Sequence, residues 1–331
     1  MSRVGDVPVA VIERALTSHG LVLDFGGARV RVRSRCRGLA AKLQVVYAEF
    51  PFQEEAKGFF DVTAALEPAR GWRSAGRRDI SFIVDGERPF EDLPADLDLP
   101  MLEWGLNWCI SQRGNHRLVL HAGVVERDGF AIVMPALPGS GKSTLTAALA
   151  TRGWRLLSDE FGPIDATDGT IVPMLRPVAL KNESIDIIRR FAPQAILGPE
   201  FPGTHKGTVA HLAPDARSVS LRHTPAPPVA VVFPKFEQGA EPRLEALPGA
   251  FSFTKLAGNS FNYSLLGPLG FASLKRLVQG VACYRIAYGT LAQAIEIVET
   301  LHRHLIVASK PFASRAPVKS ERPAEAIRAH T

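Results

Sequence analysis

The sequence has few cysteines and no long apolar run, and each absence excludes a class of protein. Its three cysteines, Cys36, Cys109 and Cys283, lie far apart and form no Cys-x-x-Cys pair, so neither a zinc ribbon nor a redox pair is expected. Such a sparse, odd count is typical of a reducing cytoplasm. No apolar stretch approaches the roughly 20 residues of a membrane span, and the N-terminus shows no signal-peptide pattern. We therefore expect a cytoplasmic protein without a membrane partner.

The chain also lacks a strong excess of one charge. Its formal net charge is +6 over 331 residues. Part of this excess lies in a basic tail, residues 309–331, whose mixture of Pro, Ala and Ser predicts disorder. The charge gives no reason to expect a nucleic-acid partner. With 46% hydrophobic and 22% charged residues, the chain is typical of a globular protein with one large or two ordinary domains.

Residues 20–88 show the alternation and turn residues of a β-rich segment. From Arg29 to Arg35 arginines alternate with mostly apolar residues, which predicts a strand with one arginine face. We interpret this face as solvated, with docking of an acidic protein or peptide as the alternative. A Pro- and Asp-rich connector, 89–100, predicts a boundary, so a small β-rich N-terminal domain would span residues 1–100. Further strands are expected at 59–63 and 79–84.

From residue 101 the pattern changes to alternating helices and strands. A helix is predicted at 101–113, with Trp104 and Trp108 on its buried face. We predict an α/β domain over residues 101–308. Its other expected elements are strands at 118–120, 130–134, 154–157, 178–180 and 229–233 and helices at 143–152 and 291–306.

A glycine-rich loop follows the apolar strand at 130–134 and precedes a helix. In such a loop the backbone N–H groups bind nucleotide phosphates, the lysine neutralises them, and the Ser or Thr hydroxyl binds Mg²⁺. The full pattern has one more glycine, at the position of Ala136. We therefore predict that ATP or GTP binds here together with Mg²⁺. The predicted contacts are Pro138, Gly139, Ser140, Gly141, Lys142, Ser143 and Thr144.

Two adjacent acids and a histidine flank this loop in the sequence. The strand at 154–157 leads to Asp159 and Glu160, and His121 ends the strand at 118–120. Phosphoryl transfer on a P-loop needs a carboxylate for Mg²⁺ and a group that positions or activates the nucleophile. In a parallel sheet, the strand of His121 could lie beside the one ending at Asp159 and orient that base. Because neighbouring side chains diverge, the two acids need not share a role.

Polar, turn-rich segments after the acids contain further candidates. We expect Arg176 and Lys206 to act as cations that stabilise the transferring phosphoryl group, with ordinary surface charge as the alternative for each. Lys181 and His211 lie in the same segments. Asn259 and Asn262 are interpreted as turn residues or substrate contacts.

These residues resemble HPr kinase/phosphorylase, a bacterial protein-serine kinase built on a P-loop. The resemblance rests on His121, the Gly-x-Gly-Lys-Ser loop at 139–143 and the acid pair. The chain is more similar still to the HprK-related kinase A group, in four segments: 103–108, 153–160, 176–182 and 206–212. The resemblance implies an α/β fold with a P-loop kinase core of the HPr kinase/PEP carboxykinase type, preceded by the small β-rich domain.

The resemblance also implies a role for each site residue. Lys142 would contact the β- and γ-phosphates of ATP, and Ser143 would bind Mg²⁺. Asp159, itself also a candidate Mg²⁺ ligand, would accept the proton of the acceptor hydroxyl. Glu160 would be a carboxylate on the metal side, and His121 would be the partner of Asp159.

The leading hypothesis is a Mg-ATP-dependent kinase that phosphorylates a hydroxyl, foremost a serine, of a protein or peptide. An HPr-like protein and a modified peptide are candidate acceptors, and HPr kinases also suggest a homo-oligomer. Two alternatives stay open. One is a nucleotide-dependent switch that hydrolyses slowly and acts through partner contacts. The other is a small-molecule kinase whose Lys- and Arg-lined pocket holds a phosphorylated or carboxylated metabolite.

Overall fold

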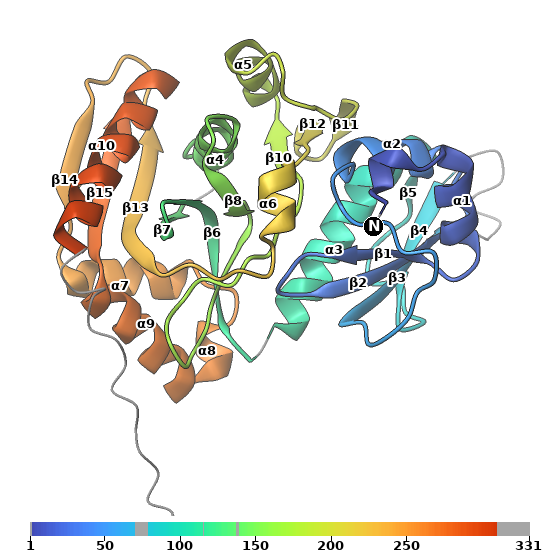
Figure 1. The fold of residues 1–331 in the computed structure, drawn as a ribbon, viewed down its shortest axis with the longest axis horizontal. Coiled ribbons are helices and arrows are strands. Elements are labelled where there is room, and N and C mark those ends of the chain that lie inside the picture. The colour runs from blue at the N-terminus through green and yellow to red at the C-terminus, as the bar shows by residue number, and fades with distance from the viewer. Residues whose placement is uncertain (1, 70–78, 115, 137–138, 310–331) are drawn as a thin grey trace, which may run out of the picture.

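Figure 1 shows a computed structural model that describes residues 2–69, 79–114, 116–136 and 139–309, a mixed α/β structure with three sheets. Residues 310–331 of the predicted tail and Pro138 of the predicted loop lie outside the described residues, whereas Ser309 ends a helix. No helix within the described ranges combines the length and apolar character needed to cross a membrane.

The first part of the chain forms a mixed five-stranded sheet. Strands β2 (Arg29–Ser34) and β3 (Val62–Pro68) are parallel, and helix α2 (Leu39–Val46) connects them. The other pairs of neighbouring strands in this sheet are antiparallel. Helix α1 (Val9–Thr17) packs on α2. The spatial order of the strands is β1 (Leu21–Asp24), β2 (Arg29–Ser34), β3 (Val62–Pro68), β4 (Asp79–Val84) and β5 (Leu93–Pro94).

The arginine strand shows the expected alternation, since Val30 and Val32 are buried while Arg33 is exposed. The guanidinium groups of Arg29 and Arg31 lie 4.9 and 5.1 Å from the centre of the Phe60 ring. Phe60 is thus held in a loop beside the arginine face, and β3 begins only at Val62. The strand expected at 59–63 is misplaced for this reason.

Helix α3 (Asp98–Arg113) follows the 3₁₀ turn η3 (Ala95–Leu97) and packs on β3 and β4. The expected buried tryptophan face is wrong, because Trp104 is half-buried and Trp108 is 37% exposed. Small and aliphatic residues of the helix face the sheet instead, among them Gly105. Helix α3 begins at Asp98, near the domain boundary expected at residue 100, and it packs on the sheet of the first part of the chain. The domain boundary therefore stays a prediction.

The second part of the chain contains a mixed seven-stranded sheet. Strands β7, β13 and β15 are parallel, whereas β6 is antiparallel to β7, β8 and β9. The expected parallel pairing of the strands before His121 and Asp159 is therefore wrong. Asp128 and Gly129, with φ of 55° and 84°, turn the chain so that β6 and β7 form a hairpin. The strands are β6 (Leu118–Arg127), β7 (Phe130–Pro135), β8 (Arg155–Ser158), β9 (Phe161–Ile164), β13 (Pro228–Phe236), β14 (Arg243–Ala246) and β15 (Ala282–Tyr288).

Helices cover both faces of this sheet. Ile132 of β7 packs in the cluster of α4 (Lys142–Thr151) and α10 (Leu291–Ser309), whereas Val133 packs in the cluster of α7 (Gly249–Gly258) and α9 (Pro268–Gly280). Alternate residues of the strand thus enter two different cores, which explains its uninterrupted apolar sequence. The short helix α8 (Tyr263–Leu266) lies beside α9 (Figure 1).

A three-stranded antiparallel sheet lies near α4 and α3. Its turn at His205 and Lys206 contacts α3, where the His205 ring centre is 4.6 Å from that of Trp104. In sequence, helix α5 (Glu183–Phe191) lies between its first two strands and α6 (Ala216–Ser220) follows its last strand. The strand order is β10 (Val178–Lys181), β12 (Gly207–Leu212) and β11 (Phe201–Thr204).

We expect Gly105→Ala to destabilise the protein. A Cβ at this position would lie 2.2 Å from the Phe82 ring, where α3 meets β4. The free energy of unfolding, measured by urea denaturation, should fall by about 1–3 kcal/mol. The matched control is Gly258→Ala in α7, where no atom lies within 4 Å of the new Cβ and the higher helix propensity of alanine should prevent a loss. Equal effects at both positions would contradict the packing of α3 on β4.

Candidate active site

The glycine-rich loop joins β7 to α4. Gly139 and Gly141 have φ of 84° and 86°, in the left-handed region that favours glycine. Gly141 precedes α4 without a side-chain cap. The first N–H groups of α4 therefore receive no capping side chain and can bind an anion at the positive end of the helix. A Cβ on Gly141 would lie 2.5 Å from the hydroxyl of Tyr288, so this position requires glycine.

The acid pair lies in a bend between β8 and β9, two strands that both pair with β6. The hydroxyl of Ser158 accepts hydrogen bonds from the N–H groups of Glu160 and Phe161, at 3.3 and 3.0 Å. The N–H of Ala122 in β6 donates to the carbonyl of Glu160 at 3.2 Å. These bonds fix Asp159 and Glu160 beside the middle of β6.

Lys142 brings the loop and the acid pair together. Its side chain is 8% exposed, and its ammonium donates a hydrogen bond to the backbone carbonyl of Asp159. The Lys142 Nζ also lies 3.6 Å from Oδ1 of Asp159 and 3.9 Å from Oε2 of Glu160. An ammonium is unfavourable in a buried place unless acceptors surround it, so these three oxygens stabilise it there. Lys142, Asp159 and Glu160 therefore lie together.

The oxygen atoms at this site suit a magnesium ion. Ser143, in the first turn of α4, presents a half-buried hydroxyl. Glu160 adds a carboxylate whose Oε2 lies 3.9 Å from the Lys142 Nζ, and the buried Asp159 beside it has an Oδ1 that accepts no hydrogen bond. Mg²⁺ is bound through one or two protein oxygens, phosphates and waters, so the donor set fits it. The described residues contain no group of three or more His, Cys, Asp or Glu that could hold a metal without such additional ligands.

His121 contacts Glu160 rather than the expected Asp159. Its Nε2 lies 3.4 Å from Oε1 of Glu160, because the antiparallel pairing sets His121 opposite Phe161 and thus next to Glu160. Asn259 holds the backbone of His121 from the other side, donating from Nδ2 to its carbonyl at 2.7 Å and accepting from its N–H at 2.9 Å. Asn262 similarly bonds to the N–H of Val119. Both asparagines therefore form hydrogen bonds with the backbone of β6.

The pKa of Glu160 is about 2, against an ordinary value of 4.5. Burial by itself raises this pKa, but the hydrogen bond from His121 and the charge of Lys142 lower it further than burial raises it. Glu160 is therefore ionised at neutral pH and is a weak proton acceptor. This property suits a carboxylate that faces a metal ion or a phosphate-binding lysine.

Arg176 lies in a buried network that differs from its expected role. Its guanidinium donates to the side chains of Asn107 and Glu103 and, at 2.9 Å, to the Glu103 carbonyl. The hydroxyl of Tyr47 donates to the same glutamate at 2.6 Å. The carboxylate of Glu103 raises the pKa of Arg176 despite its burial. Arg176 thus joins α3 to the site through its two terminal nitrogens, whereas its buried Nε–H has no hydrogen-bond partner.

A small cavity of about 50 Å³ gathers most of the other candidates. Asp159 and Glu160 line it, and so does Lys206 on the β11–β12 turn, whose ammonium lies 5.4 Å from the centre of the Trp104 ring. The full lining is Glu103, Trp104, Asn107, Ser158, Asp159, Glu160, Phe161, Met174, Arg176, Pro177, Ala179, Lys181, Lys206 and His211.

Three residues near the site were missing from the sequence-based set. Gly123 lies under α4, where a Cβ would be 2.2 Å from Oγ1 of Thr146 and 3.5 Å from Cγ of Lys142. A glycine inside an apolar strand is a sign of such close approach, so the sequence contained this signal. Tyr288 beside Gly141 and Trp104 beside Lys206 come from distant parts of the chain and have no local signal.

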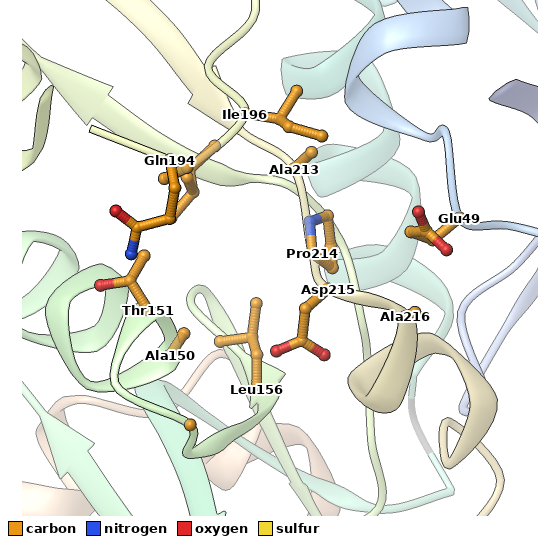
Figure 2. Close-up of a pocket in the computed structure, with 13 residues that line it drawn as sticks. Glu49, Ala150, Thr151, Leu156, Gln194, Ile196, Ala213, Pro214, Asp215 and Ala216 are labelled. Atoms are coloured by element: carbon orange, nitrogen blue, oxygen red, sulfur yellow. The ribbon is translucent and has the colours of Figure 1, made fainter. Parts of the chain in front are cut away.

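Figure 2 shows a larger cavity, of about 410 Å³, at the C-terminal end of α4. It contains none of the predicted site residues. Its carboxylates are already engaged, since Asp215 accepts a hydrogen bond from the Ser218 N–H at 2.6 Å and Glu49 pairs with Arg3 at 2.8 Å. The rest of the lining is largely apolar, so the chemistry points to the smaller cavity beside the loop.

Comparisons with known proteins give partial similarities. No protein-family model matches the chain. Over 76 residues it is 36% identical to the tRNA modification GTPase MnmE of Rhizobium etli (strain CIAT 652), a match that covers 22% of this chain and 17% of that protein. The chain thus spans less than a fifth of that GTPase. A structure of the Hpr(Ser) kinase/phosphatase from Coxiella burnetii is similar over 58% of this chain and 98% of that one, at 13% identity and a TM-score of 0.27. A likeness at this level carries no argument about fold or activity.

We expect His121→Leu to raise the pKa of Glu160 from about 2 toward its ordinary 4.5, because leucine has no donor to replace the hydrogen bond that lowers it most. A carboxyl-carbon NMR titration would measure this pKa. In the wild type, the stabilisation from this ionised glutamate is complete above pH 4.5 and is lost as the pH falls toward 2. His223→Gln, which removes a histidine near Asp24, is the control. An unchanged Glu160 pKa in His121→Leu would contradict the pairing.

Proposed function

We propose that this protein is a Mg-ATP-dependent kinase that transfers the γ-phosphoryl group to a hydroxyl of a protein or peptide. One observation carries the proposal: the loop lysine Lys142 lies at the start of α4 within 4 Å of both carboxylates of the acid pair. A phosphate site and candidate acids for metal binding and proton transfer therefore share one place. The partial similarity to a GTPase supports the coarser part of the proposal, nucleotide binding.

The residues at the site would have different catalytic and binding roles, which follow from their positions and charges. The open N–H groups of α4 and the ammonium of Lys142 would bind the phosphates and stabilise charge that develops on the transferred group. Asp159 would accept the acceptor's proton at Oδ1, the buried oxygen that has no hydrogen-bond partner. Ser143 and Glu160 would hold Mg²⁺, with His121 orienting Glu160 at 3.4 Å. When bound, Mg²⁺ supplies charge neutralisation at the phosphates.

This division favours Asp159 over Glu160 as the base. A general base works best when its pKa is near the working pH, and the Glu160 pKa of about 2 is far from it. Asp159 also lines the cavity beside the loop, from which an acceptor can reach it. The assignment of Asp159 agrees with the role implied by the family resemblance, while His121 acts on the other acid.

We expect Asp159→Asn to lower phosphoryl transfer by about 10²–10⁴-fold, the usual contribution of a general base. The measurement uses labelled ATP and a soluble extract of the source cells, with one labelled acceptor expected. The affinity for Mg-ATP should stay close to that of the wild type, because the asparagine retains the shape of the side chain.

Asp186→Asn, on the exposed side of α5, is the matched control and should transfer at the wild-type rate. Transfer by Asp159→Asn at that rate would rule out its role as the base. Tight nucleotide binding with slow hydrolysis and no labelled acceptor would instead favour the nucleotide-dependent switch. Labelling of a metabolite alone would favour a small-molecule kinase.

A further inference from the structure

The small cavity lies across the acid pair from the phosphate loop. Asp159 and Glu160 belong to both places, yet none of the loop residues 139–144 lines the cavity. Its volume of about 50 Å³ is far below the roughly 300 Å³ or more of a pocket that encloses a drug-sized ligand. The cavity can therefore hold one small polar group, and it is too small for a nucleotide.

Two lysines at this cavity form no close ion pair, although Glu160 lies near enough to act on their charges. Lys181 and Lys206 are exposed, and among the described residues neither ammonium has a carboxylate within 4 Å. Desolvation and the nearby charge of Lys181 lower the pKa of Lys206 by more than the charge of Glu160 raises it. Two like charges at one opening repel each other, and an anion between them would remove this repulsion.

The floor of the cavity has an unused hydrogen-bonding group. His211 is 1% exposed, and neither of its ring nitrogens has a hydrogen-bond partner. Its burial lowers its pKa, so the ring is neutral and has one N–H to donate. A buried polar group without a partner is unfavourable, and its place in the cavity lining points to a ligand. Arg176 beside it is committed to Glu103 and does not provide that partner.

We propose that this cavity binds an anionic group of the acceptor, a carboxylate or a phosphate, through Lys181, Lys206 and His211. The inference rests on the proposed function, because it supplies the acceptor side of the same site. An anion held there lies next to Asp159, so a hydroxyl attached to it can face that carboxylate and the nucleotide beyond. The site thereby selects acceptors that carry a negative group close to the hydroxyl to be phosphorylated.

The test is a calorimetric titration of inorganic phosphate into protein loaded with Mg²⁺ and a non-hydrolysable ATP analogue, which fills the loop. We expect the wild type to bind one phosphate. Lys206→Gln and Lys181→Gln should each weaken this binding about tenfold or more, because each removes a charge-assisted hydrogen bond. Lys255→Gln is the matched control: its ammonium also lies over an aromatic ring, Phe251 at 5.1 Å, but on α7 outside the cavity. It should bind phosphate as the wild type does.

Three results would overturn the proposal: no phosphate binding by the loaded wild type, equal binding by the cavity variants and the control, or loss of affinity for the ATP analogue in Lys206→Gln. The last would assign the lysine to the nucleotide. Failure of the wild type to bind the analogue would instead refute the proposed function. Phosphate titrated into unloaded Lys142→Met, whose loop is impaired, would still report on the cavity lysines.

Competition with bound phosphate distinguishes an anion that belongs to a peptide from one that belongs to a free metabolite. Free O-phosphoserine and glutamate represent anionic metabolites, and a short serine peptide containing glutamate represents an acidic protein segment. Displacement of phosphate by the peptide at lower concentration than by the free amino acids supports binding of a peptide anion. The reverse order supports an anionic metabolite. Displacement by none of them at concentrations that saturate with phosphate would overturn the inference that the cavity serves an acceptor.

Discussion

The position of the Lys142 ammonium is the constraint on which the rest of the site depends. A nearly buried positive charge is stable only where oxygen atoms surround it, and here they come from Asp159 and Glu160. The bend at Ser158 presents these oxygens, and Gly123 lets α4 come close enough to β6 to meet them. The geometry of the loop, the bend and the strand pairing is therefore linked through one charge.

A second buried ion pair connects this centre to the first part of the chain. Arg176 binds Glu103 of α3, and Glu103 accepts a hydrogen bond from Tyr47. Breaking such a pair leaves an uncompensated buried charge, which is strongly destabilising. The pair thus fixes α3, and with it Trp104, against the segment that follows the acid pair. In this way the five-stranded sheet contributes to the wall of the cavity although none of its strands enters it.

The parts of the site that local chemistry determines could be predicted from the sequence. The apolar run before Gly139 and Gly141 indicated the strand, the loop and the helix, and the residues after β8 indicated the acid pair. The Asp128–Gly129 turn was a local signal that β6 and β7 form a hairpin. The partner of His121 could not be predicted, because it depends on the register in which β6 pairs with the distant strand β9. Arg176 has no local mark that separates a buried structural cation from a catalytic one, since its partner Glu103 is distant in the sequence. The exposure of Trp108 could not be predicted either, because the packing of α3 decides which side of the helix is buried.

The central claim is that Lys142 and the uncapped start of α4 form a phosphate site that the acid pair completes. The most direct test is a titration of ATP, with and without Mg²⁺, into the wild type and Lys142→Met. The account predicts binding that Mg²⁺ strengthens in the wild type and a loss of affinity of about 10²-fold or more in Lys142→Met, in line with removal of a buried charged contact to phosphate. Equal affinities of the two proteins for Mg-ATP, or no binding by the wild type, would contradict it.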